Sequence, residues 1–192
     1  MEKIKNIITQ SIKVKQEILA NDEFLKIIES ISNTIVDSLK NGNRIYFCGN
    51  GGSAADAQHL AAELSGRFYS DRHALKAEAL HCNTSYLTAV ANDYDFNMIY
   101  ARLIEGIGDP GDVLIGLSTS GNSENIFRAF EIAKKKEMIT IGFTGASGGR
   151  IKPICDYLIN IPSIDTPRIQ ESHILIGHII CQLVEENFFQ NS

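Results

Sequence analysis

The stretch Cys48-Gly49-Asn50-Gly51-Gly52-Ser53 separates a short apolar run, residues 45–47, from an Ala-rich segment at residues 54–66. The run is typical of a buried strand and the Ala-rich segment of a helix. The glycines between them let the chain turn sharply and aim backbone N–H groups and the Ser53 hydroxyl at one point. Because a helix N-terminus adds unpaired donors and partial positive charge, the stretch predicts an anion site. An ordinary turn with Ser53 as N-cap is the alternative.

A second strand–loop–helix unit occurs at residues 112–136. Residues 112–117 are an apolar strand, and a helix is expected from about residue 124. The loop between them, Ser118-Thr119-Ser120-Gly121-Asn122-Ser123, is rich in hydroxyl groups. Hydroxyls and helix N–H groups can surround a phosphate without Arg or Lys. Two such units in one chain favour phosphate binding over the simple-turn interpretation.

The remaining pattern alternates helices with strands. Helices are expected at 2–20, 23–41, 84–91, 96–106 and 168–189, and strands at 77–80, 139–143 and 157–161, with a break at 92–95 and a connection at 162–167. This order predicts an α/β fold: a three-layer, doubly wound, mostly parallel sheet flanked by helices. A single domain over residues 1–192 is expected, with a helical pair at 1–41 and an α/β core at 42–192. We expect this amphipathic pair to cover apolar surface partly of the domain and partly of another subunit, and simple packing on the parent sheet is the alternative.

Composition narrows the class of protein. The 192 residues are 44% hydrophobic and carry a net charge of −5, which does not favour binding to nucleic acid or to an anionic membrane. Lys and Glu interrupt the first thirty residues, so no signal peptide is expected. The four cysteines are widely spaced and predict reduced thiols in a cytoplasmic protein.

Two pairs of side chains could carry chemistry. His59 and Glu63 are four residues apart, so they share a face of one predicted helix. Gln170 and His178 are eight apart on the last helix, about two turns, and could line one groove. A carboxylate and an imidazole suit proton transfer, and the same four residues suit a divalent metal such as zinc. The alternative for each is a structural or solvent-facing side chain, the class expected for the remaining histidines: His73, His81 and His173.

Together with Asn92-Asp93 and Arg168-Ile169-Gln170-Glu171, these motifs resemble the phosphoheptose isomerases, which belong to the sugar-isomerase (SIS) family of phosphosugar-binding domains. The resemblance covers nearly the whole chain, including the two N-terminal helices. It implies interconversion of sedoheptulose 7-phosphate and D-glycero-D-manno-heptose 7-phosphate, the first step toward the heptose of surface polysaccharide such as lipopolysaccharide. It also implies a cytoplasmic homotetramer with active sites between subunits.

The resemblance also implies a role for particular residues. The phosphate would be held by Ser53, Ser118, Thr119, Ser120 and Ser123. The rest of the substrate would be bound by Asn50, Gly51, Gly52, Glu63, Asn92, Asp93 and Gln170. One zinc ion per subunit would be held by His59, Glu63, Gln170 and His178. Some relatives have an acidic residue where this chain has Pro167, so no role is assigned to Asp165.

The expected mechanism moves a proton between adjacent carbons through an enediol. Glu63 would remove the C1 proton of the open-chain ketose, and His178 would serve the oxygens as general acid. Base and metal-ligand roles for Glu63 compete for the same oxygens. The alternative function is a non-catalytic SIS-domain binding protein of the type associated with replication initiation. Such relatives resemble this chain at both loops but lack the acid–base pair, so Glu63 and His178 favour the enzyme.

Overall fold

A parallel sheet forms the centre of the molecule in the computed structural model, which describes residues 1–189. Within that part of the chain the strands are β1 (Ile45–Gly49), β2 (Ala77–Ala79), β3 (Val113–Leu117), β4 (Ile139–Thr144) and β5 (Tyr157–Asn160). They lie in the order β2-β1-β3-β4-β5, and every neighbouring pair is parallel. Both β1 and β3 are buried along their whole length, which explains their unbroken apolar runs.

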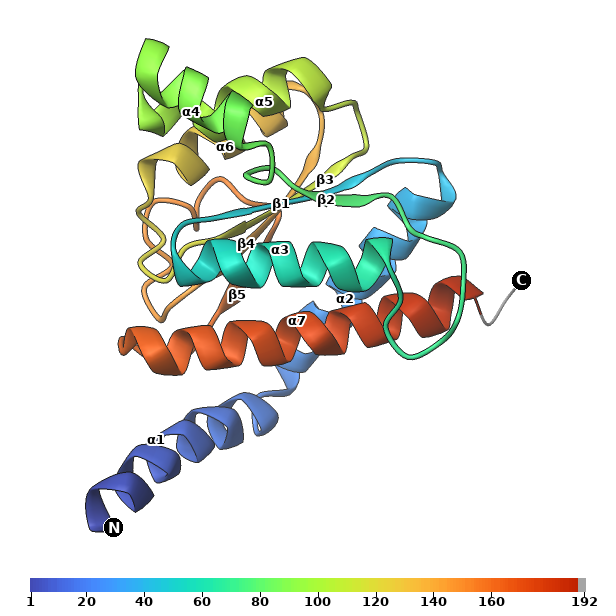
Figure 1. Cartoon of the computed structure of the whole chain (residues 1–192). Coiled ribbons are helices and arrows are strands. Elements are labelled where there is room, and N and C mark those ends of the chain that lie inside the picture. The colour runs from blue at the N-terminus through green and yellow to red at the C-terminus, as the bar shows by residue number, and fades with distance from the viewer. Residues whose placement is uncertain (190–192) are drawn as a thin grey trace.

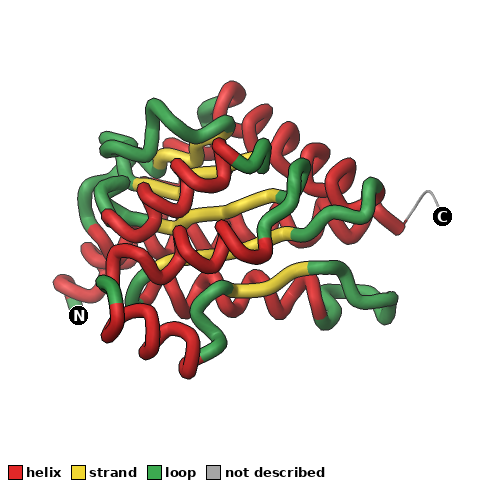
Figure 2. The backbone as a smooth tube through the Cα atoms, turned by 90° about the horizontal axis from the view of Figure 1, so that it is seen from above, coloured by secondary structure: helices red, strands yellow, loops and turns green. Residues whose placement is uncertain are grey.

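Helices cover both faces of the sheet (Figure 1). One face carries α2 (Asp22–Lys40), α3 (Gly52–Ser65) and α7 (Thr166–Phe189), and the other carries α4 (Thr84–Asp93), α5 (Ile99–Ile107) and α6 (Glu124–Lys135). Figure 2 shows the strands side by side across the molecule. The expected three-layer α/β architecture is therefore confirmed. Within residues 1–189, no helix is both long enough and apolar enough to cross a bilayer.

The strand order reverses between β1 and β3. From β1 the chain goes to the edge strand β2, then returns to β3 on the other side of β1 and continues outward. Gly49 and Leu117, the last residues of β1 and β3, are register partners. The two loops of the sequence pattern therefore start side by side at the carboxyl edge of the sheet, where doubly wound domains bind ligands.

The N-terminal helices differ in how much apolar surface they bury. The stripe expected on α2 is buried in the core, including Ile31 and Ile35. By contrast, α1 (Glu2–Leu19) extends away from the body of the molecule and contacts mainly α7 and α2 (Figure 1). Four of its isoleucines remain 43–59% exposed: Ile4, Ile7, Ile8 and Ile12. Only part of this helix is therefore covered by its own domain.

The boundaries of α4, α5 and α7 differ from the sequence prediction in ways that have a structural reason. The break expected at residues 92–95 begins only at Tyr94, because α4 continues through Asp93. The helix expected from residue 96 opens with a 3₁₀ turn, Phe96–Met98, capped by the Asp95 side chain, which accepts from the Asn97 N–H at 2.6 Å. Helix α7 begins at Thr166, so Pro167 lies in its first turn, where a missing N–H leaves no helical bond unmade.

Candidate active site

The first loop turns tightly between β1 and α3. A Cβ added at Gly49 would lie 2.3 Å from the Ser53 carbonyl oxygen, so this position requires glycine. Gly51 has φ +55°, in the left-handed region, and is the N-cap of α3. The alternative interpretation, in which Ser53 is the N-cap, therefore does not hold, and Ser53 is buried inside the first turn. Gly51 and Gly52 are exposed, so their backbone is open to a ligand.

The second loop is organised by its own hydroxyl groups. Ser118, which is buried, places its Oγ 2.9 Å from the Oγ of Ser123, the N-cap of α6. The Oγ of Ser120 accepts from the Asn122 N–H at 3.1 Å. Gly121 has φ +67°, and an added Cβ would lie 2.1 Å from the Gly148 carbonyl oxygen. The loop is therefore packed tightly on the loop that follows β4.

A polar pocket of about 260 Å³ opens beside this second loop. Its lining combines Thr119, Ser120 and Asn122 with residues 145–147 of the loop after β4 and with Thr166 at the start of α7. Hydroxyl and amide groups near a helix N-terminus suit an anion. The pocket therefore has the chemistry that the sequence predicts for a phosphate site.

A reciprocal amide pair joins the two loops. Asn50 Nδ2 donates to Asn125 Oδ1 at 2.9 Å, and Asn125 Nδ2 donates back to Asn50 Oδ1 at 2.9 Å. Asn125 is buried in the first turn of α6. The pair fixes Asn50, a predicted substrate residue, against the helix that follows the second loop.

Helices α3 and α7 lie side by side and bring three ionisable groups together (Figure 1). His59 Nε2 lies 2.9 Å from His178 Nε2 and 3.1 Å from Glu63 Oε1. The ligand atoms of the three residues all lie within 4.8 Å of one another. Two imidazole nitrogens at this distance can share one proton or bind one cation. We name His59, Glu63 and His178 the two-helix cluster.

Other predicted site residues lie apart from this cluster. The Gln170 amide lies against Gly52, since a Cβ added at Gly52 would be 2.8 Å from Gln170 Nε2. Gln170 is eight residues from His178, about 12 Å along the helix. In this structure its side chain therefore lies at the N-terminal end of α3, next to the first loop, and not at the two-helix cluster. Asn92 and Asp93 lie exposed at the end of α4, on the opposite face of the sheet from α3, where Asn92 Nδ2 donates to Asp93 Oδ1 at 2.9 Å.

Burial shifts the pKa values of two ionisable side chains near the site. Burial raises the pKa of Asp56, one turn before His59 on α3, although His59 and His178 oppose that shift. Burial also lowers the pKa of His81, which follows β2, toward the neutral imidazole. His173 is enclosed beneath the sheet edge and donates from Nε2 to the Thr144 carbonyl at 3.1 Å. His173 is thus structural, which is one of the two roles that the sequence analysis expects for it.

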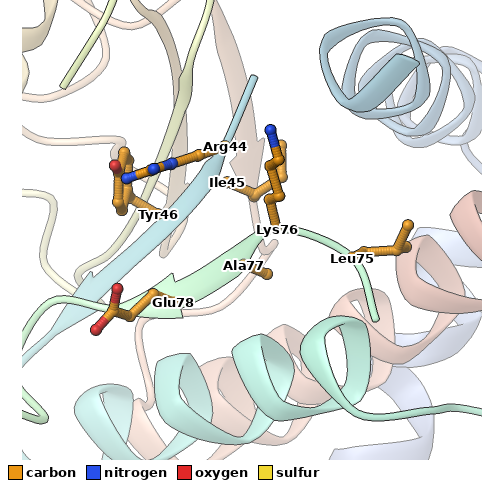
Figure 3. Close-up of a pocket in the computed structure, with 7 residues that line it drawn as sticks. All are labelled: Arg44, Ile45, Tyr46, Leu75, Lys76, Ala77 and Glu78. Carbon is orange, nitrogen blue, oxygen red and sulfur yellow. The ribbon is translucent and has the colours of Figure 1, made fainter. Parts of the chain in front are cut away.

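Another pocket, of about 300 Å³, lies at the amino ends of β1 and β2, away from the carboxyl ends that carry the two loops (Figure 3). It is lined by residues at the beginning of β1 and β2, among them Arg44, Tyr46, Lys76 and Glu78. Because it faces the amino ends of the strands, it is separate from both loops. None of its lining residues belongs to the predicted site.

Comparison with known proteins identifies the family. The SIS domain family model matches residues 8–145. A phosphoheptose isomerase from Aneurinibacillus thermoaerophilus is 53% identical over 188 residues, covering 98% of this chain and 95% of the relative. The chain belongs to the phosphoheptose isomerases of the SIS family.

Solved structures of phosphoheptose isomerases share the fold of this family member. The protein from Neisseria gonorrhoeae is 39% identical with a TM-score of 0.90, covering 96% of this chain and 98% of that one. The protein from Francisella tularensis is 35% identical with a TM-score of 0.92, covering 96% and 97%. Agreement over nearly full length includes the two N-terminal helices and the long α7.

Sequence reasoning missed two residues that shape the first loop of the candidate site. Asn125 holds Asn50, and the Tyr100 hydroxyl, buried on α5, donates to the carbonyl of Gly49. A polar residue at the buried position 125 of a predicted amphipathic helix was the available signal for Asn125. Tyr100 left no signal, because its partner lies 51 residues away in sequence.

Proposed function

We propose that this chain interconverts sedoheptulose 7-phosphate and D-glycero-D-manno-heptose 7-phosphate, an aldose–ketose isomerisation. The single observation that carries the proposal is the two-helix cluster, which places a carboxylate and two imidazoles within 4.8 Å in a chain that also has two phosphate-type loops. Two relatives that match 98% and 97% of this chain bear the name phosphoheptose isomerase. The reaction would supply the heptose of a surface polysaccharide, in the cytoplasm.

The two loops would bind the phosphosugar. We assign the phosphate to the hydroxyls of Ser53, Ser118, Thr119, Ser120 and Ser123. The sugar would contact Asn50, Gly51, Gly52, Asn92, Asp93 and Gln170. The polar pocket beside Ser120 supports the phosphate assignment, because its groups donate hydrogen bonds and carry no negative charge.

The two-helix cluster would carry the proton transfer. Glu63 would remove the C1 proton of the open-chain ketose, which gives an enediol, and would return a proton to C2. His178 would move protons at the two oxygens, so that no charged enediolate accumulates. The cluster is partly open, with the Glu63 side chain 22% exposed, so a substrate can reach the carboxylate.

The cluster also fits a metal ion. Two imidazole nitrogens and a carboxylate oxygen are the donor set of many catalytic zinc sites. His59, Glu63 and His178 would hold one Zn²⁺ per subunit, with Gln170 as the fourth predicted ligand. Bound zinc supplies Lewis-acid polarisation of a carbonyl. Gln170 would have to leave Gly52 to reach the cluster.

We further propose that the chain forms one SIS domain, residues 1–192, and assembles as a homotetramer with active sites between subunits. The exposed isoleucines of α1 support assembly, because such a row is expected to be buried against another chain. Asn92 and Asp93, exposed and away from α3, would reach a substrate bound at a neighbouring subunit.

Turnover of sedoheptulose 7-phosphate by purified protein tests the proposal, with the product trapped by a heptose kinase. The assay is run untreated, with chelator, and with zinc restored. Glu63→Gln should abolish nearly all turnover and leave phosphosugar binding measurable. Near-normal turnover in that variant would refute the assignment of Glu63. No turnover by the wild type, with intact phosphosugar binding, would favour the non-catalytic SIS-domain protein.

A further inference from the structure

Arg72 and Glu185 form a buried ion pair behind the two-helix cluster. Arg72 Nε lies 2.8 Å from Glu185 Oε2, and the side chains are only 3% and 4% exposed. Removing two charges from water is unfavourable, and the pair offsets that penalty only if its other polar atoms are also hydrogen-bonded. The partners of those atoms therefore indicate what the pair is for.

Glu185 holds the segment that follows α3. Its Oε1 accepts from the backbone N–H groups of Tyr69 and Ser70 at 2.9 and 2.8 Å. Its Oε2 accepts from the Phe68 N–H at 3.2 Å in addition to Arg72. Burial alone would raise the pKa of Glu185, but these donors keep the pKa below its ordinary value. The carboxylate thus fixes three consecutive residues to α7.

Arg72 holds the C-terminal end of α3. Its guanidinium donates to the carbonyl oxygens of Glu63 at 2.8 Å and Leu64 at 2.7 Å, and to that of Gly66 at 3.0 Å. Carbonyls in the last turn of a helix lack partners within the helix. Arg72 therefore caps α3 at the residue whose side chain belongs to the two-helix cluster.

The pair connects the two helices that carry the cluster. Glu185 is seven residues after His178 on α7, about two turns, so both lie on the side that faces α3. Glu185 accepts a hydrogen bond from the backbone N–H of Phe68, and the centroid of the Phe68 ring lies 5.8 Å from that of the His178 ring. The contacts run from His178 through α7 to Glu185, then through Arg72 to the backbone of Glu63.

We propose that Arg72 and Glu185 are positioning residues that keep Glu63 and His178 in register for the reaction. This inference rests on the proposed function. Apolar side chains would stabilise the same packing at lower cost, because a buried ion pair often gains nothing over well-packed hydrophobic residues. Unlike apolar contacts, the hydrogen bonds of the pair are directional. They therefore fix the position of α3 along α7.

The test compares Glu185→Gln with a matched control, Asp112→Asn. Asp112 is also a buried carboxylate that accepts backbone N–H groups, from Arg44 at 2.8 Å and Asp109 at 2.9 Å, but at the amino edge of the sheet. Both variants should lose thermal stability. At a temperature where circular dichroism shows both folded, Glu185→Gln should lose kcat at least about tenfold with KM changed less than about threefold, because misplacement of about 1 Å is that costly.

Arg72→Lys and cobalt binding complete the test. Arg72→Lys keeps the positive charge but cannot make the several hydrogen bonds that the guanidinium donates to backbone carbonyls. Its kcat should therefore fall as much as that of Glu185→Gln. The second measurement is a titration of the metal-free protein with Co²⁺, monitored by the visible absorption of the bound ion. Co²⁺ should bind about tenfold more weakly to Glu185→Gln than to the wild type and Asp112→Asn.

The outcomes separate the two proposals. If the wild type does not turn over the sugar but binds Co²⁺, the proposed function is wrong. The Co²⁺ affinities of the variants then decide whether Arg72 and Glu185 position the two-helix cluster. If Glu185→Gln keeps the kcat and Co²⁺ affinity of Asp112→Asn, the pair only stabilises the fold and our inference is overturned. A wild type that shows neither turnover nor Co²⁺ binding would overturn both.

Discussion

His173 makes the stability of this protein sensitive to mild acid. The imidazole is enclosed by the Phe143 ring and the end of β4, and it donates to the Thr144 carbonyl at 3.1 Å. A carbonyl can only accept, so the proton lies on Nε2; among the described residues Nδ1 has no partner. Protonation of Nδ1 would create a buried charge without a counter-ion. Burial accordingly lowers the pKa of His173 to about 4.

The magnitude follows from linkage between protonation and unfolding. In the unfolded chain a histidine has a pKa of about 6.5, so between about pH 6.5 and 4 the unfolded state binds more protons than the native state. The free energy of unfolding therefore falls as the pH falls through this window. Between pH 7 and pH 4.5 the loss from His173 is about 2 kcal/mol, at 1.36 kcal/mol per pKa unit.

Urea unfolding of the wild type and His173→Gln at pH 7 and pH 4.5, at one protein concentration, measures this contribution. The pH-dependent loss should be about 2 kcal/mol smaller in the variant. His73→Gln, at an exposed histidine, is the control and should keep the wild-type dependence. An equal pH-dependent loss in the wild type and His173→Gln would refute the reasoning, because it would mean that His173 protonates as readily in the folded protein as in the unfolded chain.

Three further predictions address the loops and the cluster. Asn125→Ala removes both bonds to Asn50 and should lower the free energy of unfolding by about 1–3 kcal/mol, with reduced kcat/KM; an unchanged urea midpoint and unchanged turnover would contradict it. Gly49→Ala places a Cβ 2.3 Å from the Ser53 oxygen, so phosphosugar binding measured by calorimetry should be lost, and wild-type affinity would argue against the tight turn. Zinc should raise the Tm of the wild type but not of His59→Ala, and an equal rise in both would place the ion elsewhere.

Local patterns in the sequence predicted the fold because they agree with the tertiary structure. The unbroken apolar runs of β1 and β3 require burial on both faces, which only a sheet covered by helices provides. The polar loops after these strands then meet at one edge, because parallel strands have their carboxyl ends on the same side. The spacing of His59 and Glu63 also predicted their shared helical face, which the structure confirms at 3.1 Å.

The rest of the site depends on contacts between distant segments, which spacing does not encode. Arg72 and Glu185 are separated by 113 residues, and no local pattern marks them as partners. Gln170 shares α7 with His178, but the packing of α3 against α7 determines that its amide lies at Gly52. The row of exposed isoleucines on α1 is periodic in the sequence, but a single chain cannot specify its partner.

The most direct test of the central claim is isomerisation of sedoheptulose 7-phosphate in D₂O, with the product analysed by NMR spectroscopy. Proton transfer through Glu63 predicts deuterium at C2 of the aldose and at C1 of the recovered ketose, and none in either sugar with Glu63→Gln. A product formed by Glu63→Gln at the wild-type rate, with the same incorporation of deuterium, would contradict the assignment of this cluster as the site of enediol chemistry.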